Sequence, residues 1–248
     1  MAPATPRPRF NSSKLTRFLA DLAVADVADG KQSFAERLGL WLDWKDAISL
    51  SAALNEGGGK PATLSPPPPS AEALAAEVAR VRRDLTASIR ADGVFAPGKA
   101  RISLPTPTAG ETAESAANFT PYRHYHLAHQ RAMEALIGPL RGRVRGALAG
   151  ASLSLSRLAA VDAVLDEALR ERERNLFSSV PLLLEKQFQR QLTAHQAALG
   201  GKPDNPELWM QPGAWLARYC RDMQGALLAE LDTRLQAVEG LLEALANR

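Results

Sequence analysis

The feature that most constrains the fold is the spacing of apolar side chains in the C-terminal half of the chain, where they recur every three or four residues. Between residues 214 and 246 the series consists of Leu216, Cys220, Met223, Leu227, Leu231, Leu235, Val238, Leu242 and Leu245. A longer series runs from Ser154 to about Leu199. Residues at this spacing share one face of an α-helix, and its persistence over several heptads is typical of coiled coils. We therefore expect two helices of roughly 35–45 residues, about 50–65 Å long. They should pack on each other as an antiparallel hairpin or on a second copy of the chain.

Glycines and prolines predict where these helices bend and end. Pro139 interrupts an earlier apolar series that starts at Tyr122, and Pro181 lies within the longer series. Because proline lacks a backbone N–H and crowds the preceding turn, we expect a kink at Pro139 and a kink or a helix end at Pro181. Gly200-Gly201, followed by a proline, predicts the end of the longer helix. The loop that follows carries Trp209, whose indole is expected to dock against a helix.

The N-terminal part of the chain predicts a separate helical unit. Two helices are expected between residues 12 and 55, and residues 33–36 (Ser-Phe-Ala-Glu) form a capping box at the start of the second. Trp41 and Trp44 lie in this second helix, which carries apolar residues on both sides. A helix with two apolar sides is usually buried, so the second helix is expected to be the centre of a small core.

Six segments follow from these patterns: a disordered tail (1–11), an N-terminal helical unit (12–55), a Gly/Pro linker (56–69), a helix (70–93), a flexible connector (94–118) and a long-helix bundle (119–248). Aromatic residues make up only 6% of the chain, and alanine and leucine dominate its apolar residues, which favours helices over strands. The expected fold class is all-α: a small N-terminal helical unit and a long C-terminal antiparallel hairpin or coiled-coil-like bundle, joined by disordered Pro/Gly linkers.

Composition also bears on location. Cys220 is the only cysteine, so no intramolecular disulfide can form, and a reducing compartment such as the cytoplasm is expected. The first ten residues contain no apolar run typical of a signal peptide, and no stretch approaches the roughly 20 apolar residues of a membrane span. We expect no membrane insertion, although indirect association with a membrane stays open. The net charge of +3 is too small to indicate a dedicated nucleic-acid-binding protein.

Histidines and the cysteine are the residues that could carry chemistry. His126 and His129 share a helix face, as two metal ligands one turn apart must, but His124 points away from it. No Asp, Glu or Cys lies near them in sequence to complete a tetrahedral site. Cys220 lies on an apolar stripe, where a free cysteine usually packs as a small hydrophobe. We therefore predict no catalytic, metal-binding or cofactor-binding residue and no enzymatic activity.

Three arginines give the strongest indication of nucleic-acid binding. Arg141, Arg143 and Arg145 could contact phosphates without regard to base sequence. At alternate positions, however, they spread around a helix rather than along one groove, and tyrosines that could stack on bases occur only at the far end of the same segment. A solvated helix face or an acidic protein partner is the favoured explanation.

Two tryptophans are candidates for a protein-binding surface. Trp41 and Trp44 could form an exposed docking site, because tryptophan is enriched at interaction hot spots. Packing in a core is the more common role for such residues. Together with the three arginines they make up the candidate partner-binding set.

Two segments of the chain resemble a known family when they are taken together. One is Gln32 to Leu38, continuing through Trp41, Trp44 and Asp46 to residues 52–54, and the other is residues 122–133. They resemble a bacterial family described as domain of unknown function 3348. The resemblance implies no activity, cofactor or catalytic residue. Genes of that family often lie beside genes for OmpA-like and MotA/ExbB-like membrane proteins, so the resemblance implies a cytoplasmic accessory of an envelope-spanning complex.

The sequence thus favours a non-enzymatic helical scaffold or adaptor that acts through helix–helix contacts, either with a protein partner or with a second copy of the chain. The alternative is a nucleic-acid-associated protein that binds phosphates through the region from Arg141 to Arg145. A metal-dependent enzyme using His126 and His129 is a third hypothesis.

Overall fold

The computed structural model describes residues 15, 18, 41–56, 69–96 and 98–247. Its elements in chain order are α3 (Trp44–Glu56), α4 (Ala71–Arg90), α5 (Ala113–Ala116), α6 (Thr120–Ala149), α7 (Leu153–Leu199), the 3-10 helix η1 (Pro206–Leu208) and α8 (Trp215–Ala246). The described residues contain helices and no strand, which confirms the predicted all-α class.

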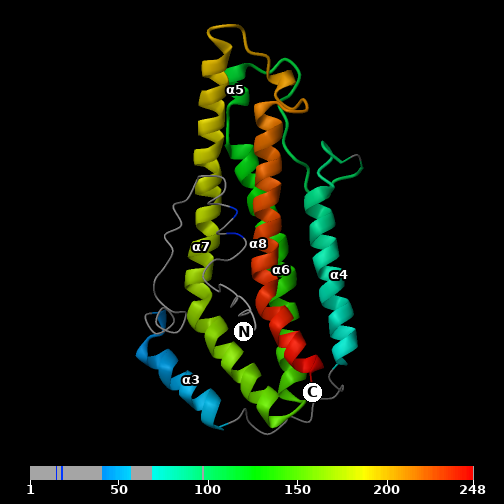
Figure 1. Ribbon diagram of the computed structural model, residues 1–248, viewed down its shortest axis with the longest axis vertical. Coiled ribbons are helices and arrows are strands. Elements are labelled where there is room, and N and C mark those ends of the chain that lie inside the picture. Colours follow the sequence, from blue (N-terminus) through cyan, green and yellow to red (C-terminus); the bar gives the residue numbers. More distant parts are fainter. Residues whose placement is uncertain (1–14, 16–17, 19–40, 57–68, 97, 248) are drawn as a thin grey trace, which may run out of the picture.

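Four long helices form an antiparallel bundle. Successive long helices α4, α6, α7 and α8 alternate in direction along one axis, as Figure 1 shows. α6 packs against both α7 and α8, and α4 lies on α8 and α6. The predicted pairing of the two longest helices is present, because α7 and α8 are joined at one end and contact each other. The short helix α3 lies on α7 outside the bundle.

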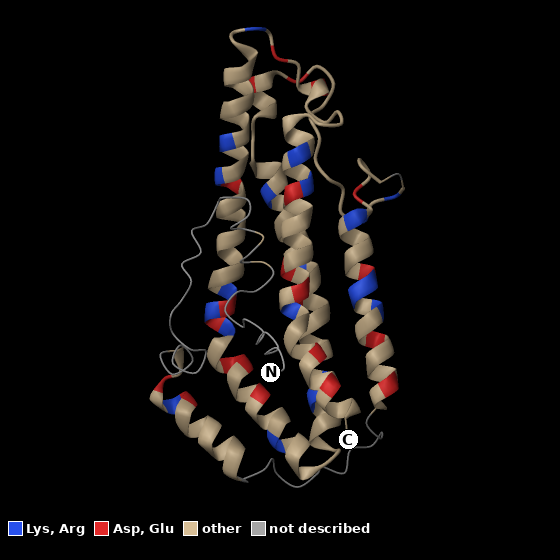
Figure 2. Cartoon of the chain, viewed as in Figure 1, with Lys and Arg blue, Asp and Glu red and all other residues tan. Residues whose placement is uncertain are grey.

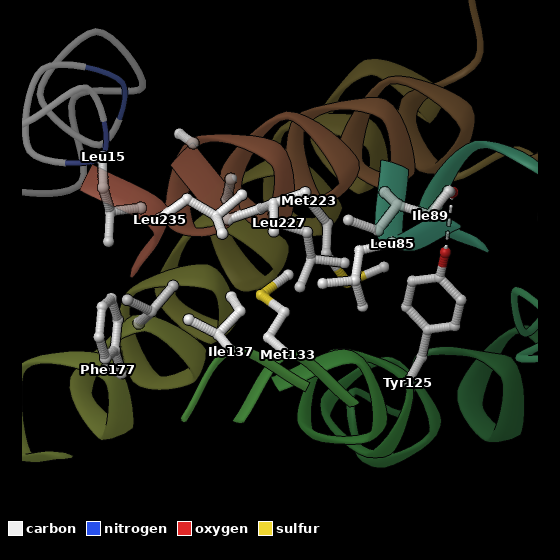
Figure 3. Close-up of a cluster of buried hydrophobic side chains, with 14 of the residues drawn as sticks. Leu15, Leu85, Ile89, Tyr125, Met133, Ile137, Phe177, Met223, Leu227 and Leu235 are labelled. Carbon is white, nitrogen blue, oxygen red and sulfur yellow. Dashed lines mark hydrogen bonds between the residues drawn. The ribbon is translucent and has the colours of Figure 1, made fainter. Parts of the chain in front are cut away.

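The core is built mainly on α8. All but one of the apolar residues predicted to share a face of this helix are buried, and Leu242 is partly buried. In Figure 3, Leu227 and Leu235 of α8 face Met133 and Ile137 of α6, with Leu85 of α4 beside them. Complete burial of a leucine or methionine side chain stabilises the fold by roughly 1.5–3 kcal/mol. The apolar periodicity of α8 therefore gives both its position and much of its stability.

The helix ends follow local chemistry. The Ser70 hydroxyl accepts a hydrogen bond from the backbone N–H of Ala73 at the start of α4, and the Ser152 hydroxyl does the same for Leu155 at the start of α7. Such N-caps typically contribute about 1 kcal/mol each. Gly200 ends α7 in the left-handed conformation with φ 58°, which glycine adopts without steric cost. The predicted end at Gly200 is confirmed.

The prolines within the long helices do not end them. α7 continues through Pro181 for 47 residues, about 70 Å at 1.5 Å per residue. Likewise, α6 continues through Pro139. α7 bends along its length in Figure 1. Of the two alternatives predicted at Pro181, the helix end is therefore wrong.

In the segment predicted as a flexible connector at 94–118, the structure describes residues 94–96 and 98–118. It carries α5 and buries Leu104. The buried Asp92 holds its start, because one carboxylate oxygen accepts hydrogen bonds from the backbone N–H groups of Val94 and Phe95, each at 2.7 Å. The other oxygen accepts from Gln224 of α8 at 2.6 Å. The turn after α4 is thereby attached to the bundle.

Of the predicted N-terminal unit, the structure describes Leu15, Phe18 and residues 41–55, which carry α3. Leu15 is buried in the bundle core, and the ring of Phe18 lies so close to Gly225 of α8 that an added Cβ would stand 2.5 Å from it. The capping box at 33–36, the tail at 1–11 and residues 57–68 of the linker lie outside the described residues.

Candidate functional sites

Arg141 and Arg145 project from α6 onto two carboxylates of α7. Arg141 donates to both oxygens of Asp162, at 3.0 and 2.6 Å, and to Asp166 at 2.7 Å. Arg145 donates to Asp166 at 2.8 Å. The side chain of Arg141 is only 17% exposed. Burial opposes its ionisation, but the hydrogen bonds and charges of the two aspartates outweigh burial and raise the pKa of Arg141.

Arg143 leaves the same helix in another direction and reaches α4, where it forms an ion pair with Glu77. The three arginines therefore do spread around α6, as predicted, but the solvated face predicted for Arg141 is wrong. Each guanidinium meets a carboxylate of the same chain, and basic and acidic residues lie side by side along these helices in Figure 2. These ion pairs attach α6 to α7 and to α4.

The two candidate tryptophans lie on the surface. Trp44 is 82% exposed at the start of α3, and Ile48, one turn later on the same face, is 54% exposed. Trp41 is partly exposed, and the guanidinium of Arg172 on α7 lies 5.7 Å from its ring centroid. The expectation that this helix forms the centre of a core is wrong for Trp44 and Ile48. The side chains that α3 turns inward, such as Leu50, are only partly buried.

The histidines predicted to share a face are both fully buried in α6. Within the part of the chain that the structure describes, neither ring nitrogen of His126 has a hydrogen-bond partner, and the Nε2 of His129 also has none. Burial lowers the pKa of His126 to about 3 and that of His129 to about 4, so both imidazoles are neutral at ordinary pH. His124 is exposed, as its position on the helix predicts. Cys220 is buried on the apolar stripe of α8, and burial raises the pKa of its thiol.

A buried carboxylate lies beside His126. Glu230 of α8 is fully buried, and one of its oxygens accepts hydrogen bonds from Arg234 at 2.9 Å while the other accepts from Gln130 at 2.9 Å. His126 Nε2 lies 3.9 Å from this second oxygen. Burial raises the pKa of Glu230, and the charge of Arg234 offsets only part of this effect. The guanidinium of Arg234 also stacks over the ring of Phe177, 3.8 Å from its centroid.

The same network explains how α7 passes Pro181. A proline at this position cannot donate to the carbonyl of Phe177, four residues earlier, so that carbonyl loses its helical partner. The side-chain amide of Gln130 donates to it at 3.0 Å. Gln130 thus connects the carbonyl exposed by Pro181 to the carboxylate of Glu230, and α6, α7 and α8 meet in one polar contact.

A cavity of about 880 Å³ lies at the end of the bundle where α7 turns into α8. In its wall, His195 Nε2 stands 3.0 and 3.1 Å from the two oxygens of Asp204, and Trp209 Nε1 donates to Asp204 at 2.8 Å. A carboxylate can only accept, so the hydrogen of His195 is on Nε2 and Nδ1 is an acceptor when the ring is neutral. The imidazole is stacked on Trp215, with ring centroids 5.8 Å apart and an interplanar angle of 27°. Trp209 docks against this end of the bundle, as predicted.

Comparison with known proteins gives a family. The sequence model of a family described as "Protein of unknown function (DUF3348)" matches residues 1–247. The chain belongs to the DUF3348 family. No curated protein and no solved structure matches this DUF3348 chain. The resemblance carried by residues 32–54 and 122–133 is therefore confirmed.

Two sites of the DUF3348 chain were not predicted from the sequence: the polar network around Glu230 and the cavity where α7 turns into α8. The sequence does contain an indication of the first. Glu230 stands three residues after Leu227 and one before Leu231, within the predicted apolar face of α8. A charged residue there must be buried with partners or break the pattern. Pro181 inside a predicted helix likewise implied a carbonyl in need of a donor. For the cavity there was no signal, because nothing in the sequence shows that Asp204 folds back onto His195.

Two further observations limit the sites of this DUF3348 protein. No group of three or more His, Cys, Asp or Glu side chains is arranged to hold a metal ion anywhere in the described residues. None of the helices in the part of the chain that the structure describes is long and apolar enough to cross a membrane.

Proposed function

We propose that this DUF3348 protein is a non-enzymatic helical scaffold, acting in the cytoplasm, that binds an amphipathic helix of a partner protein on the face of α3 formed by Trp44 and Ile48. The observation that carries the proposal is the 82% exposure of the Trp44 side chain on a helix that is itself packed on α7. Large aromatic side chains are the most common anchors of protein interfaces.

The surroundings of α3 suit a docking site. Trp44 and Ile48 are four residues apart, so they form one apolar face along the helix. Apolar side chains at this spacing match the pattern by which an amphipathic helix binds another helix. The Asp43 and Asp46 carboxylates cap the start of α3 by accepting hydrogen bonds from each other's backbone N–H groups. A capped helix that rests on α7 presents its outer face in a defined orientation, which lowers the entropy cost of binding.

The nucleic-acid alternative has less support. Arg141, Arg143 and Arg145 are each paired with a carboxylate of the same chain. A phosphate would have to displace Asp162, Asp166 or Glu77, and breaking a partly buried ion pair costs free energy. Each arginine that stays paired with its own carboxylate contacts no phosphate and adds nothing to the salt dependence typical of phosphate binding.

The single cysteine favours the cytoplasm as the site of action, because disulfide-free chains suit a reducing compartment. The gene context that the family resemblance implies directs the search for a partner to the cytoplasmic segments of an envelope complex. We therefore expect the helix bound by α3 to belong to such a segment.

The test is cross-linked affinity capture from cells that produce the protein naturally, with nuclease treatment and quantitative mass spectrometry. The baits are the wild-type protein, a Trp44→Ala/Ile48→Ala variant and a Val94→Ala control. Val94 is also an exposed apolar residue, but it follows α4 on the far side of the bundle from α3. Circular dichroism establishes that all three baits are folded.

We expect a partner that survives nuclease, is retained by the Val94→Ala control and is depleted at least about tenfold by the α3 variant. Equal capture by all three baits would exclude α3 as the docking site. Capture abolished by nuclease would favour nucleic-acid binding instead. If the α3 variant changes only the oligomeric state measured by light scattering, the occupant of this face is a second copy of the chain.

A further inference from the structure

We propose that the outward side of α4, together with the loop that follows it, binds the phosphate backbone of a nucleic-acid duplex without regard to base sequence. Four exposed basic residues carry the proposal: Arg83, Arg90, Lys99 and Arg101. α4 lies at the edge of the bundle opposite α3, as Figure 1 shows, so this surface is independent of the docking face proposed above.

The two sides of α4 differ, and one of them presents a row of cations. The side turned toward α8 and α6 buries Leu74, Val78, Val81, Leu85 and Ile89. Arg83 and Arg90 are seven residues apart, about two turns, so they share the opposite side and stand about 10 Å apart along the helix axis. Exposed alanines lie beside them at Ala76, Ala79 and Ala87. Such short side chains let a phosphate backbone come close, and they offer no hydrogen bond to a base edge.

The loop after α4 folds back and brings two more cations to the same end of the helix. A Cβ added to Gly93 would stand 3.4 Å from the Cβ of Ala100. Lys99 and Arg101 flank Ala100 in the sequence, so both are close to the last turn of α4, which carries Arg90. In Figure 2, basic residues mark both this end of α4 and the loop beyond it.

These four cations differ from the paired arginines of α6. None of the four forms an ion pair within 4 Å among the residues that the structure describes. Arg82, by contrast, is bonded to two carboxylates of α8. Arg80 lies 3.9 Å from Glu77 and one turn before Asp84, so it does not belong to the row. A phosphate could therefore bind the four cations without displacing a carboxylate of the same chain.

The acidic residues of this region do not cancel the charge of the row. Asp84 and Asp92 are the acidic residues between positions 83 and 104. Asp92 is only 1% exposed, and its carboxylate is bonded to backbone N–H groups of the loop and to Gln224. Asp84 lies about 100° around the helix from Arg83, on its flank. This end of α4 thus holds four exposed cations and one exposed carboxylate.

The length and chemistry of the row match a duplex backbone. One strand of a duplex presents a phosphate every 3.4 Å or so along its axis, so a row of about 10 Å and the adjoining loop meet roughly four phosphates. Three of the four cations are arginines, whose planar guanidinium binds a phosphate through two hydrogen bonds.

Other anionic partners fit this surface less well. A helix that binds a membrane inserts an apolar face, but the apolar side of α4 is buried in the bundle. The core of a protein interface is apolar, whereas the exposed large apolar residue among the described residues 71–104 is Val94 alone. Single strands are held by aromatic stacking, and Phe95 of the loop is partly buried with the Arg221 guanidinium 4.9 Å from its ring centroid.

The test measures fluorescence anisotropy of two labelled duplexes of about 20 base pairs with unrelated sequences, and of one single strand, between about 50 and 200 mM salt. The wild type is compared with Arg83→Gln/Arg90→Gln/Lys99→Gln/Arg101→Gln. The matched control is Arg123→Gln/Arg131→Gln/Arg157→Gln/Arg174→Gln, which removes as many exposed positive charges from α6 and α7. Trp44→Ala/Ile48→Ala tests independence from α3. Circular dichroism establishes that every variant is folded, and vesicles of anionic phospholipid serve as the second ligand.

We expect the wild type to bind both duplexes equally, with a slope of log affinity against log salt of about −3 to −4. The α4 variant should bind at least about tenfold more weakly, while the matched control and the α3 variant bind within about twofold of the wild type. Equal weakening in the matched control would show that net charge alone attracts the duplex, and it would overturn the proposal. Absence of duplex binding, tighter binding of the single strand, or binding of vesicles in place of the duplex would overturn it as well.

Discussion

At the scale of single residues, the buried polar side chains set the conditions under which the protein is stable. His126, His129 and Glu230 are all buried, and none of them belongs to a group of three or more side chains that could hold a metal ion in the described residues. Gln130 and Arg234 satisfy the carboxylate, whereas both nitrogens of His126 and the Nε2 of His129 have no hydrogen-bond partner among the described residues. Burial without a partner favours the neutral form of a titratable group. Because burial shifts the pKa of these side chains, the free energy of unfolding must depend on pH.

Acidification below neutral pH should destabilise the protein through the two histidines. Burial lowers their folded-state pKa to about 3 for His126 and about 4 for His129, below the ordinary 6.5. The unfolded chain therefore binds protons below about pH 6.5 that the folded chain binds only near pH 4 at His129 and near pH 3 at His126. The free energy of unfolding falls through this window by about 1.4 kcal/mol per pH unit for each histidine. Glu230 has the opposite effect on the free energy of unfolding. Its pKa is raised in the folded state, so the folded chain binds a proton at a higher pH than the unfolded chain does, and acidification stabilises the fold through this group.

A His129→Phe variant separates these effects, since phenylalanine keeps the aromatic contact with Tyr125, whose ring centroid is 4.6 Å away. When urea unfolding is measured at about pH 5 and about pH 6.5, the free energy of unfolding of this variant should change with pH less steeply than that of the wild type, by about 1 kcal/mol per pH unit. The control is the same replacement at His124, which is exposed on the same helix. Identical slopes for all three proteins would mean that His129 is not kept neutral by burial.

At the scale of elements, α7 is continuous because a side chain from another helix replaces a missing backbone donor. Gln130 of α6 donates to the Phe177 carbonyl that Pro181 leaves unpaired, and it donates to Glu230 as well. We expect Gln130→Leu to destabilise the fold by about 2–3 kcal/mol, since it leaves a carbonyl and a carboxylate without this partner. In a Pro181→Ala background the cost should be smaller by about 1 kcal/mol, because the substitution restores a backbone N–H for the carbonyl.

This prediction is a double-mutant cycle measured by chemical denaturation. Gln130→Leu should cost less free energy of unfolding in the Pro181→Ala background, but it should still cost some. Glu230 loses its hydrogen bond from Gln130 in both backgrounds. Strict additivity of the two substitutions would show that Gln130 does not compensate for Pro181. Gln224→Leu, which removes a similar amide bonded to Asp92 and the Ile89 carbonyl, should not couple to Pro181→Ala.

The elements also show what the sequence could predict. The apolar spacing of α8 and the glycine at 200 predicted a helix and an end correctly, because both depend on residues close in sequence. The exposure of Trp44 and the partners of Arg141 were not predictable, since they depend on how α3 and α6 lie against α7. The attachment of Val94 and Phe95 to the bundle depends on Asp92 and Gln224, which are 132 residues apart. Periodicity identifies a helix with one apolar face, but it does not identify the residue that a polar side chain meets across the bundle.

At the scale of the whole molecule, the contacts between helices predict cooperative unfolding of the bundle. α4 is attached to α8 by Arg82, which forms ion pairs with Asp232 and Glu239, and by Asp92 through Gln224. α6 is attached to α7 by the pairs of Arg141 and Arg145 described above. No long helix is held by apolar contacts alone, so the opening of one should disturb the others.

Cys220 is a built-in probe of this cooperativity. Its side chain is fully buried on α8 and burial raises its pKa, so a thiol reagent can react only after the bundle opens. We expect reaction with Ellman's reagent at least about 1,000-fold slower than for a cysteine introduced at the exposed position of Ala246, in a variant whose own Cys220 is replaced by alanine. The rate should rise with denaturant in parallel with global unfolding measured by circular dichroism. Reaction that is fast, or that does not depend on denaturant, would mean that α4 detaches from α8 while the other helices stay folded, and the bundle would then consist of independently stable parts.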